Sequence, residues 1–320
     1  MFQTTVCRSI SSCVNSAVAT ACHVFTSYLP PHHSYRWSAR IKKGIYMSQK
    51  RSKNSLLVAF LLTLSVVFTF LALRDYSEYR AGTETYAAVS DSCTSEAPSE
   101  ENVEEAETAP DINALKEFPK PLKAPITVDF KKLHEINEDV IGWIYIGAFP
   151  ISYPVLYAEN NDAYLRTTIE HKSNNAGSIF VDHACSPDFR DRNTVIYGHN
   201  MHDLSMFGKL KWFLEPENGT DYFGKDDSIW IITPDRTFKY KIFSIYITSP
   251  DGDAYTLFQR DTELFADWCR KMKEMTKVQT VPNRFTNRTR VITLSTCAAT
   301  TDKRLVVLAR LVKWSENKEE

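Results

Sequence analysis

The chain has 320 residues, enough for one large domain with appendages. A formal net charge of -1 excludes a basic field that would attract nucleic acid, and the ordinary composition excludes a low-complexity class. The 7 cysteines include no CxxC pair and no His/Cys spacing typical of zinc ligands. We therefore expect no metal site, no cofactor, no disulfide framework and no nucleic-acid partner.

Residues 1–46 differ from the rest of the chain. They contain a Pro30–Pro31 break and show no clear periodicity. We expect this extension to be disordered or to be absent from the natural protein. Translation would then start at Met47, which opens a basic cytoplasmic segment at 47–54.

An uncharged apolar run extends from Ser55 to Leu73. As a helix it would span about 28 Å, enough for a bilayer core. Basic residues at 50, 51 and 53 precede the run, so the positive-inside rule predicts a single-pass membrane anchor with a cytoplasmic N-terminus and an extracellular C-terminal part. The run exceeds a signal-peptide core, lacks a clean cleavage site and has no polar face, which disfavours both a cleaved signal and a buried core helix.

After the anchor, residues 74–125 are expected to form an extracellular acidic linker. From about Ala81 to Pro125 the segment is rich in Glu, Ser, Thr, Ala and Pro. Such a composition buries little apolar surface and repels itself, which predicts an extended tether.

The folded domain is expected over 126–320. Phe130, Leu133 and Ile136 have helical spacing behind a possible Asp129 cap. Short strand-like runs bounded by turn residues then predict a mainly β (α+β) fold, either a barrel or a sandwich. These runs are Gly142–Ile146, Ile151–Leu156, Ser178–Val181, Thr194–Tyr197, Ser228–Thr233, Arg236–Ile247, Val291–Thr296 and Arg304–Val312.

Two helical inserts interrupt the strands, at Leu204–Leu214 and Thr262–Val278. The second carries an apolar stripe, which we expect to pack on the β-structure.

Cys297 ends one predicted strand and Arg304 opens the next. A short hairpin connection would bring them together at one end of a sheet, where the cation stabilises a thiolate or an oxyanion. Arg310 has the same parity but lies about 20 Å farther along an extended strand, so Arg304 is the better partner. The alternative for Cys297 is a small buried core residue.

Two other cysteines test this hypothesis. Cys269 lies within the second insert and is expected to be structural. Cys185 lies in a loop near two arginines and is the weaker rival nucleophile.

His199 is the favoured acid/base because Gly198 permits a sharp turn at the end of the preceding strand. His183 and His202 are its competitors. The alternative for His199 is a turn histidine bonded to backbone.

Several segments resemble those of one family. Thr293–Cys297 resembles the TLxTC strand of sortases, and Tyr197–Met201 resembles their histidine segment. Arg304 lies where the family arginine follows the cysteine. Further segments that look like class B are Asn137–Ile144, Tyr153–Val155 and Met206–Gly208, together with the long insert before the cysteine strand.

The resemblance implies a closed eight-stranded sortase-type β-barrel with an N-terminal helix, and a membrane-anchored cysteine transpeptidase. Cys297 would attack the threonyl carbonyl of a sorting signal, Arg304 would stabilise the carbonyl or oxyanion, and His199 would be the acid/base. Its partners would be surface proteins with an NPxTN-like or LPxTG-like signal and a peptidoglycan precursor or cell-wall amine. The resemblance also implies a sorting-signal groove lined by Asn161, Leu165 and Ser295.

Three alternatives remain open. A hydrolytic cysteine peptidase would use the same residues with water as the acceptor. A non-catalytic surface binding module would keep Cys297 as a buried core thiol. A class A sortase is disfavoured by the Leu-Ser pair before Thr296 and by the helical insert.

Overall fold

The computed structural model describes residues 40–97, 122–215, 221–258, 263–278, 280, 284–298 and 302–317. The chain divides into two compact units, Met1–Phe68 and Thr69–Glu320. Of the expected N-terminal extension, residues 1–39 lie outside the described residues, whereas 40–46 belong to a helix. The linker residues 98–121 also lie outside the described residues.

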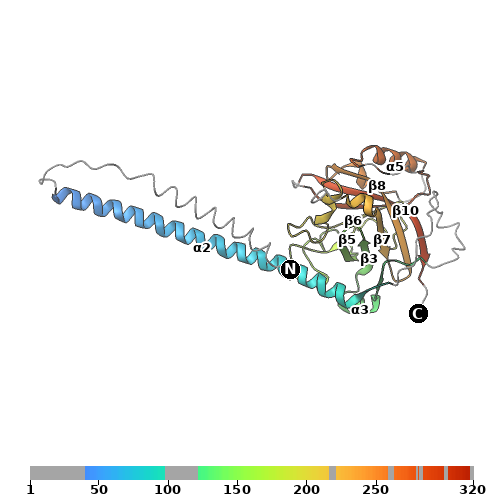
Figure 1. Cartoon of the computed structure of the whole chain (residues 1–320), viewed down its shortest axis with the longest axis horizontal. Helices are drawn as coiled ribbons and strands as arrows, with labels where there is room; N and C mark the ends of the chain where they lie inside the picture. The colour runs from blue at the N-terminus through green and yellow to red at the C-terminus, as the bar shows by residue number, and fades with distance from the viewer. Residues whose placement is uncertain are drawn as a thin grey trace. The chain divides into compact units, whose positions relative to one another are not determined.

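Helix α2 (Arg40–Cys93) contains the predicted membrane anchor. Among the described residues, it is the one helix long and apolar enough to cross a membrane (Figure 1). Its side chains between Leu56 and Leu73 are exposed, with Leu56 at 68% and Leu73 at 62%. An uninterrupted apolar surface of this length is typical of a segment that faces lipid.

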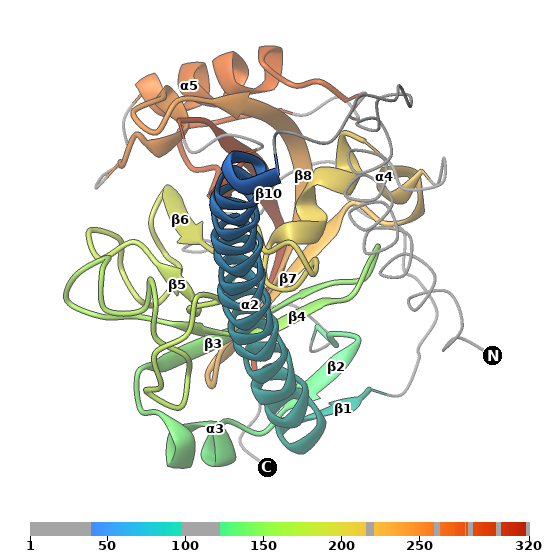
Figure 2. The same ribbon diagram turned by 90° about the vertical axis from the view of Figure 1, so that its left-hand side faces the viewer.

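Beyond the apolar run, the prediction of an extended linker is wrong for the described residues of 74–97. Helix α2 continues to Cys93, and β1 (Thr94–Glu96) pairs with β2 (Ile126–Val128) in a two-stranded antiparallel sheet (Figure 2). Tyr86 and Val89 on the helix are buried in the same hydrophobic cluster as the domain core. Burial of these side chains supplies the stabilisation that composition alone did not reveal.

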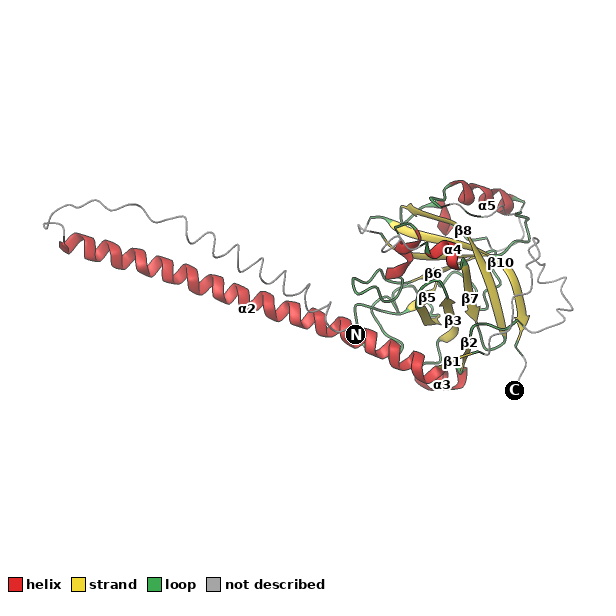
Figure 3. Cartoon of the chain, viewed as in Figure 1, coloured by secondary structure: helices red, strands yellow, loops and turns green. Residues whose placement is uncertain are grey.

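Eight strands of the described chain close into a barrel with the order β10-β8-β7-β3-β4-β5-β6-β9. Figure 3 shows the strands in yellow. Neighbouring strands are antiparallel except for the parallel pairs β4–β5 and β6–β9. The predicted closed eight-stranded barrel is confirmed, and the sandwich alternative is wrong. The strands are β3 (Val140–Ile146), β4 (Ile151–Leu156), β5 (Ile179–Val181), β6 (Asn193–Tyr197), β7 (Ser228–Ile232), β8 (Arg236–Thr248), β9 (Val291–Cys297) and β10 (Arg304–Glu316).

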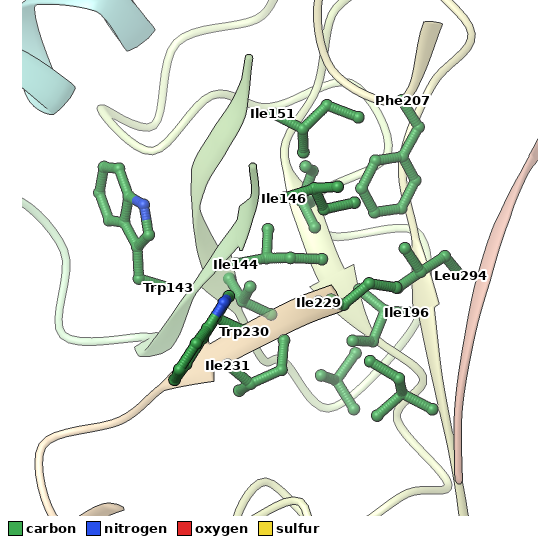
Figure 4. Packing of buried hydrophobic residues seen from close by; sticks show 14 of the residues in the cluster. Trp143, Ile144, Ile146, Ile151, Ile196, Phe207, Ile229, Trp230, Ile231 and Leu294 are labelled. Carbon is green, nitrogen blue, oxygen red and sulfur yellow. The ribbon is translucent and has the colours of Figure 1, made fainter. Parts of the chain in front are cut away.

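The barrel interior is filled by branched aliphatic side chains. Ile144 and Ile146 share one face of β3, since they are two residues apart. Ile196 of β6 lies opposite Leu294 of β9. All four are fully buried, and Figure 4 shows them gathered between the strands. This packing fixes the relative positions of β6 and β9, whose ends carry the candidate site.

Several short helices lie between the strands in the chain. In α3 (Phe130–Ile136), the predicted Asp129 cap accepts a hydrogen bond from the Lys132 amide at 3.1 Å. The insert predicted at Thr262–Val278 forms α5 (Leu264–Glu274), which packs near β8 (Figure 1). The insert predicted at Leu204–Leu214 contains only a 3₁₀ helix, η1 (Gly208–Phe213). Two further short elements are α4 (Tyr222–Lys225) and the 3₁₀ helix η3 (Asp253–Tyr255).

Candidate active site

The parallel pairing of β6 with β9 brings two chain segments to the same edge of the barrel. Tyr197 at the end of β6 lies opposite Ser295 of β9, and the Gly198 amide donates to the Ser295 carbonyl at 3.1 Å. Because parallel strands end on the same side, His199 and Cys297 follow at one edge.

Arg304 lies directly opposite Cys297 in the antiparallel pair of β9 with β10. Directly opposite residues of such a pair point to the same face of the sheet, so the thiol and the guanidinium share a face. Arg310 lies opposite Val291, at the other end of β9. The register therefore places Arg304, and not Arg310, beside the cysteine.

A tightly packed turn presents His199. A Cβ atom on Gly198 would come within 2.6 Å of the Phe207 ring, so a side chain there would displace that ring. The Phe207 amide donates to the His199 carbonyl at 3.0 Å, which closes the loop. Leu204 and Met206 in this loop have positive φ angles of 67° and 53°, a backbone conformation uncommon for residues other than glycine.

Two hydrogen bonds tie this turn to its surroundings. The Nε2 atom of His199 lies 2.7 Å from the Leu165 carbonyl oxygen. The Asn200 side chain donates through Nδ2 to the Cys297 carbonyl at 2.9 Å. The histidine turn and the end of the cysteine strand are thus directly connected.

A cavity of about 230 Å³ opens at this edge of the barrel. The three predicted catalytic residues and the three predicted groove residues all line this cavity: Asn161, Leu165, His199, Ser295, Cys297 and Arg304. The remaining lining residues are Asp162, Phe180, Tyr197, Gly198 and Thr296. A half-buried thiol, an imidazole and a guanidinium therefore border one recess that an extended peptide could enter.

The three predicted groove residues differ in their surroundings. Asn161 donates through Nδ2 to the Asp182 carboxylate at 3.1 Å and accepts from the His183 amide at 2.9 Å. The Leu165 side chain is 39% exposed, so an apolar surface is offered to a ligand. Ser295 is buried, and its hydroxyl lies 2.7 Å from the Tyr255 hydroxyl.

Sequence reasoning missed two tyrosines at the site. The Tyr197 hydroxyl donates to the Asp182 carboxylate at 2.8 Å. Burial raises the pKa of Tyr197, and the negative charge of Asp182 raises it further. The Tyr255 ring stacks on Tyr197 with centroids 6.4 Å apart. Burial raises the Tyr255 pKa, an effect that Arg304 and the bond to Ser295 oppose. Both tyrosine hydroxyls therefore remain protonated near neutral pH.

The loop that contains η3 places Tyr255 against two residues of the cavity lining, Ser295 and Tyr197. Asn193 donates through Nδ2 to the carbonyls of Ala254 and Thr256 at 3.0 and 3.1 Å. This side-chain amide is buried on β6, six residues before His199. No local pattern in the sequence reveals this contact, because it joins positions about sixty residues apart.

The rival cysteines are buried away from the cavity lining. Burial raises the pKa of Cys185 to about 12, and the Cys185 thiol donates to the Asn193 carbonyl at 3.7 Å. Burial also raises the pKa of Cys269. Among the four cysteines in the described ranges, Cys93, Cys185 and Cys269 are buried, whereas Cys297 is half-buried. Neutral buried thiols are poor nucleophiles, which disfavours Cys185 and Cys269.

The rival histidines also lie outside the cavity lining. Nδ1 of His183 is 3.6 Å from the Asp182 carboxylate, and the His202 side chain is exposed. Within the part of the chain that the structure describes, no three His, Cys, Asp or Glu side chains gather in a metal-binding arrangement.

Comparisons with known proteins show to which family this chain is similar. The family model described as Sortase domain matches residues 144–312. Sortase B of Listeria monocytogenes is 33% identical over 187 residues, which cover 58% of this chain and 74% of the relative. Sortase B of Staphylococcus aureus is 32% identical over 193 residues, covering 58% and 75% respectively. The crystal structure of sortase B from B. anthracis in complex with AAEK1 has a TM-score of 0.57 and 28% identity, covering 74% of this chain and 99% of that one.

The chain therefore belongs to the sortase family, and its relatives place it in class B. The class B assignment excludes the alternative of a class A sortase. The chain is a cysteine transpeptidase, which excludes the alternative of a non-catalytic binding module. Sortases act on proteins that carry a sorting signal and on cell-wall amine acceptors.

Proposed function

We propose that this chain is a membrane-anchored class B sortase that cleaves a C-terminal sorting signal after threonine and transfers the protein to a cell-wall amine. The observation that carries the proposal is the placement of Cys297 opposite Arg304, with His199 lining the same cavity. Nucleophile, cation and proton carrier then surround one reacting carbonyl.

In the first half-reaction, the Cys297 proton passes to His199, the Sγ thiolate attacks the threonyl carbonyl, and the carbon–nitrogen bond to the next residue breaks. His199 protonates the leaving amine, so that a thioacyl-enzyme remains. Arg304 stabilises the negative charge that develops on the carbonyl oxygen.

In the second half-reaction, an incoming cell-wall amine attacks the thioester carbonyl. His199 accepts the proton of the amine, the new amide bond forms and the Cys297 thiolate leaves. The acceptor we favour is a peptidoglycan precursor or another cell-wall amine.

We assign recognition of the sorting signal to Asn161, Leu165 and Ser295, since all three line the cavity beside the reacting groups. The signal would be NPxTN-like or LPxTG-like. The exposed Leu165 side chain offers an apolar contact, while Asn161 and Ser295 offer polar ones.

We further propose a single-pass topology, in which the segment 55–73 spans the cell membrane. Lys50, Arg51 and Lys53 precede this segment, so the N-terminus would be cytoplasmic and the barrel extracellular.

A peptide-library cleavage assay tests the proposal. The full chain in detergent micelles is incubated with peptides that carry each type of signal, with and without an added amine, and products are identified by mass spectrometry. Transpeptidation predicts an amide product that contains the added amine. Release of only the free threonyl acid in the presence of amine would instead indicate the hydrolytic peptidase. The Cys297→Ala variant is the matched control and should yield neither product.

A further inference from the structure

The hydrogen bond between His199 and the Leu165 main chain determines which ring nitrogen carries the proton. The Nε2 atom lies 2.7 Å from the Leu165 carbonyl oxygen. A carbonyl oxygen only accepts hydrogen bonds, so Nε2 must carry a hydrogen. Because neutral imidazole has a single N–H, Nδ1 is then the atom free to take up and release a proton.

Close backbone packing around Gly177 holds this carbonyl in place. Gly177 has a φ of +55°, and a Cβ atom there would lie 2.4 Å from the Leu165 oxygen. The neighbouring Ser178 amide donates to the Tyr164 carbonyl at 3.0 Å. Any side chain at 177 would therefore displace the group that His199 contacts.

Helix α2 supports the same turn through Tyr86. The Tyr86 hydroxyl donates to the Gly177 carbonyl at 2.6 Å and lies 2.8 Å from the Ser178 hydroxyl. The side chain is only 4% exposed, although it comes from the helix that continues the apolar run. The turn is thus held by a buried hydrogen bond between the helix and the barrel.

Tyr86 also contacts the structure on the histidine side. Its ring packs edge-on against Tyr153, with centroids 5.6 Å apart. The Tyr153 hydroxyl accepts from the Met206 amide at 3.1 Å, in the loop that His199 begins. Tyr86 therefore contacts both Gly177, which packs against the Leu165 carbonyl, and Tyr153, which bonds to the loop that follows His199.

We propose that the Leu165 carbonyl orients the His199 imidazole, and that Tyr86 and Gly177 are positioning residues that hold this carbonyl. A main-chain oxygen then performs the orienting task that a carboxylate performs in a Ser-His-Asp triad. The consequence for catalysis rests on the proposed role of His199, whereas the hydrogen-bond arrangement does not depend on it.

The test uses the full chain in detergent micelles, with histidines labelled by ¹⁵N and the His199 signals assigned from a His199→Gln variant. We expect a proton signal coupled to Nε2 that exchanges slowly with water, and an unprotonated Nδ1 in the neutral ring. Tyr86→Phe and Gly177→Ala should lose this slowly exchanging proton. Tyr240→Phe, which removes another buried hydroxyl from β8, should retain it.

Kinetics of peptide cleavage provide the second measurement. A misplaced acid/base lowers kcat while leaving ground-state binding intact. Tyr86→Phe should therefore lower kcat about tenfold with little change in KM. Gly177→Ala should lower it further, and Tyr240→Phe should resemble the wild type.

A His199 proton on Nδ1, or an unchanged Nε2 proton and kcat in Tyr86→Phe, would overturn the positioning proposal. If Gly177→Ala fails to fold, Tyr86→Phe decides alone. A wild-type chain with the expected Nε2 signal but no cleavage would refute the proposed function and leave the hydrogen-bond assignment in place.

Discussion

Cys297 and Arg304 are direct partners in the β9–β10 pair, and the Ala298 amide donates to the Lys303 carbonyl at 3.0 Å just beyond them. The first backbone bond of the hairpin connection thus forms immediately next to the two residues. Their relative position is set by strand register, which is far more rigid than a loop. Any change in that register would separate the thiol from the guanidinium.

Replacing Arg304 with lysine should lower kcat/KM for peptide cleavage by about 100-fold, because lysine cannot reproduce a planar two-pronged donor. Arg310→Lys is the matched control. Arg310 is buried opposite Val291, so its replacement should affect thermal stability more than turnover. Equal losses of kcat/KM in the two variants would contradict the assignment of Arg304.

Cys297→Ala should abolish both cleavage and the thioacyl-enzyme seen by intact-protein mass spectrometry. Cys185→Ala and Cys269→Ala should keep the chemistry, since burial raises the pKa of both thiols and keeps them protonated. A thioacyl adduct on the Cys297→Ala chain would reassign the nucleophile.

The closed barrel followed from the resemblance to sortases, because the strand-like runs alone left a sandwich open. The strands themselves were predictable from sequence because they are apolar runs bounded by turn residues. The continuation of α2 was not, because the segment after the anchor is rich in small and polar residues. A signal was nevertheless present: Tyr79, Gly82, Tyr86, Val89 and Cys93 recur at intervals of three and four residues. This stripe is the face of α2 that packs on the barrel.

At the candidate site, Cys297 and Arg304 were predictable because hairpin register follows from local sequence. Tyr255 and Asp182 were not, because long-range contacts bring them against residues that line the cavity. Asp182 accepts hydrogen bonds from Tyr197 and Asn161, which lie 15 and 21 residues away. The sequence also did not predict how short η1 is. Positive φ angles at Leu204 and Met206 interrupt the helix that was expected there.

A fragment that starts at residue 74 should be markedly more stable than one that starts at residue 122. The longer fragment retains Tyr86, Val89 and Cys93, all at most 5% exposed. Burial of one large apolar side chain contributes about 1.5–3 kcal/mol, so the loss should amount to several kcal/mol. Chemical denaturation of the two fragments checks this expectation, and coincident unfolding midpoints would show that α2 is dispensable for the barrel.

The buried Cys185 thiol should make part of the stability dependent on alkaline pH. Its pKa rises from 9.0 to about 12 on folding. Between these values the unfolded chain loses the thiol proton while the folded chain keeps it, so stability falls as pH rises. The free-energy advantage of the wild type over Cys185→Ala should therefore shrink, by at most about 1.4 kcal/mol per pH unit.

Urea denaturation from pH 8 to 11 measures this dependence. Val89→Ala removes no ionisable group and is the control, and its difference from the wild type should stay constant with pH. A pH-independent difference for Cys185→Ala would show that the thiol is solvated in the folded state.

The Ser295–Tyr255 contact should couple the cysteine strand to the η3 loop. The two hydroxyls lie 2.7 Å apart, and Ser295 is only two residues before Cys297. Ser295→Ala and Tyr255→Phe each remove one partner of the same hydrogen bond. Their effects on kcat/KM should therefore be less than additive in the double variant, with a coupling energy of about 1 kcal/mol.

Tyr157→Phe is the control for this double variant. The Tyr157 hydroxyl donates instead to the His183 carbonyl at 2.9 Å, so this substitution should combine additively with Ser295→Ala. Additive effects of Ser295→Ala and Tyr255→Phe would mean that the two hydroxyls act independently on the substrate.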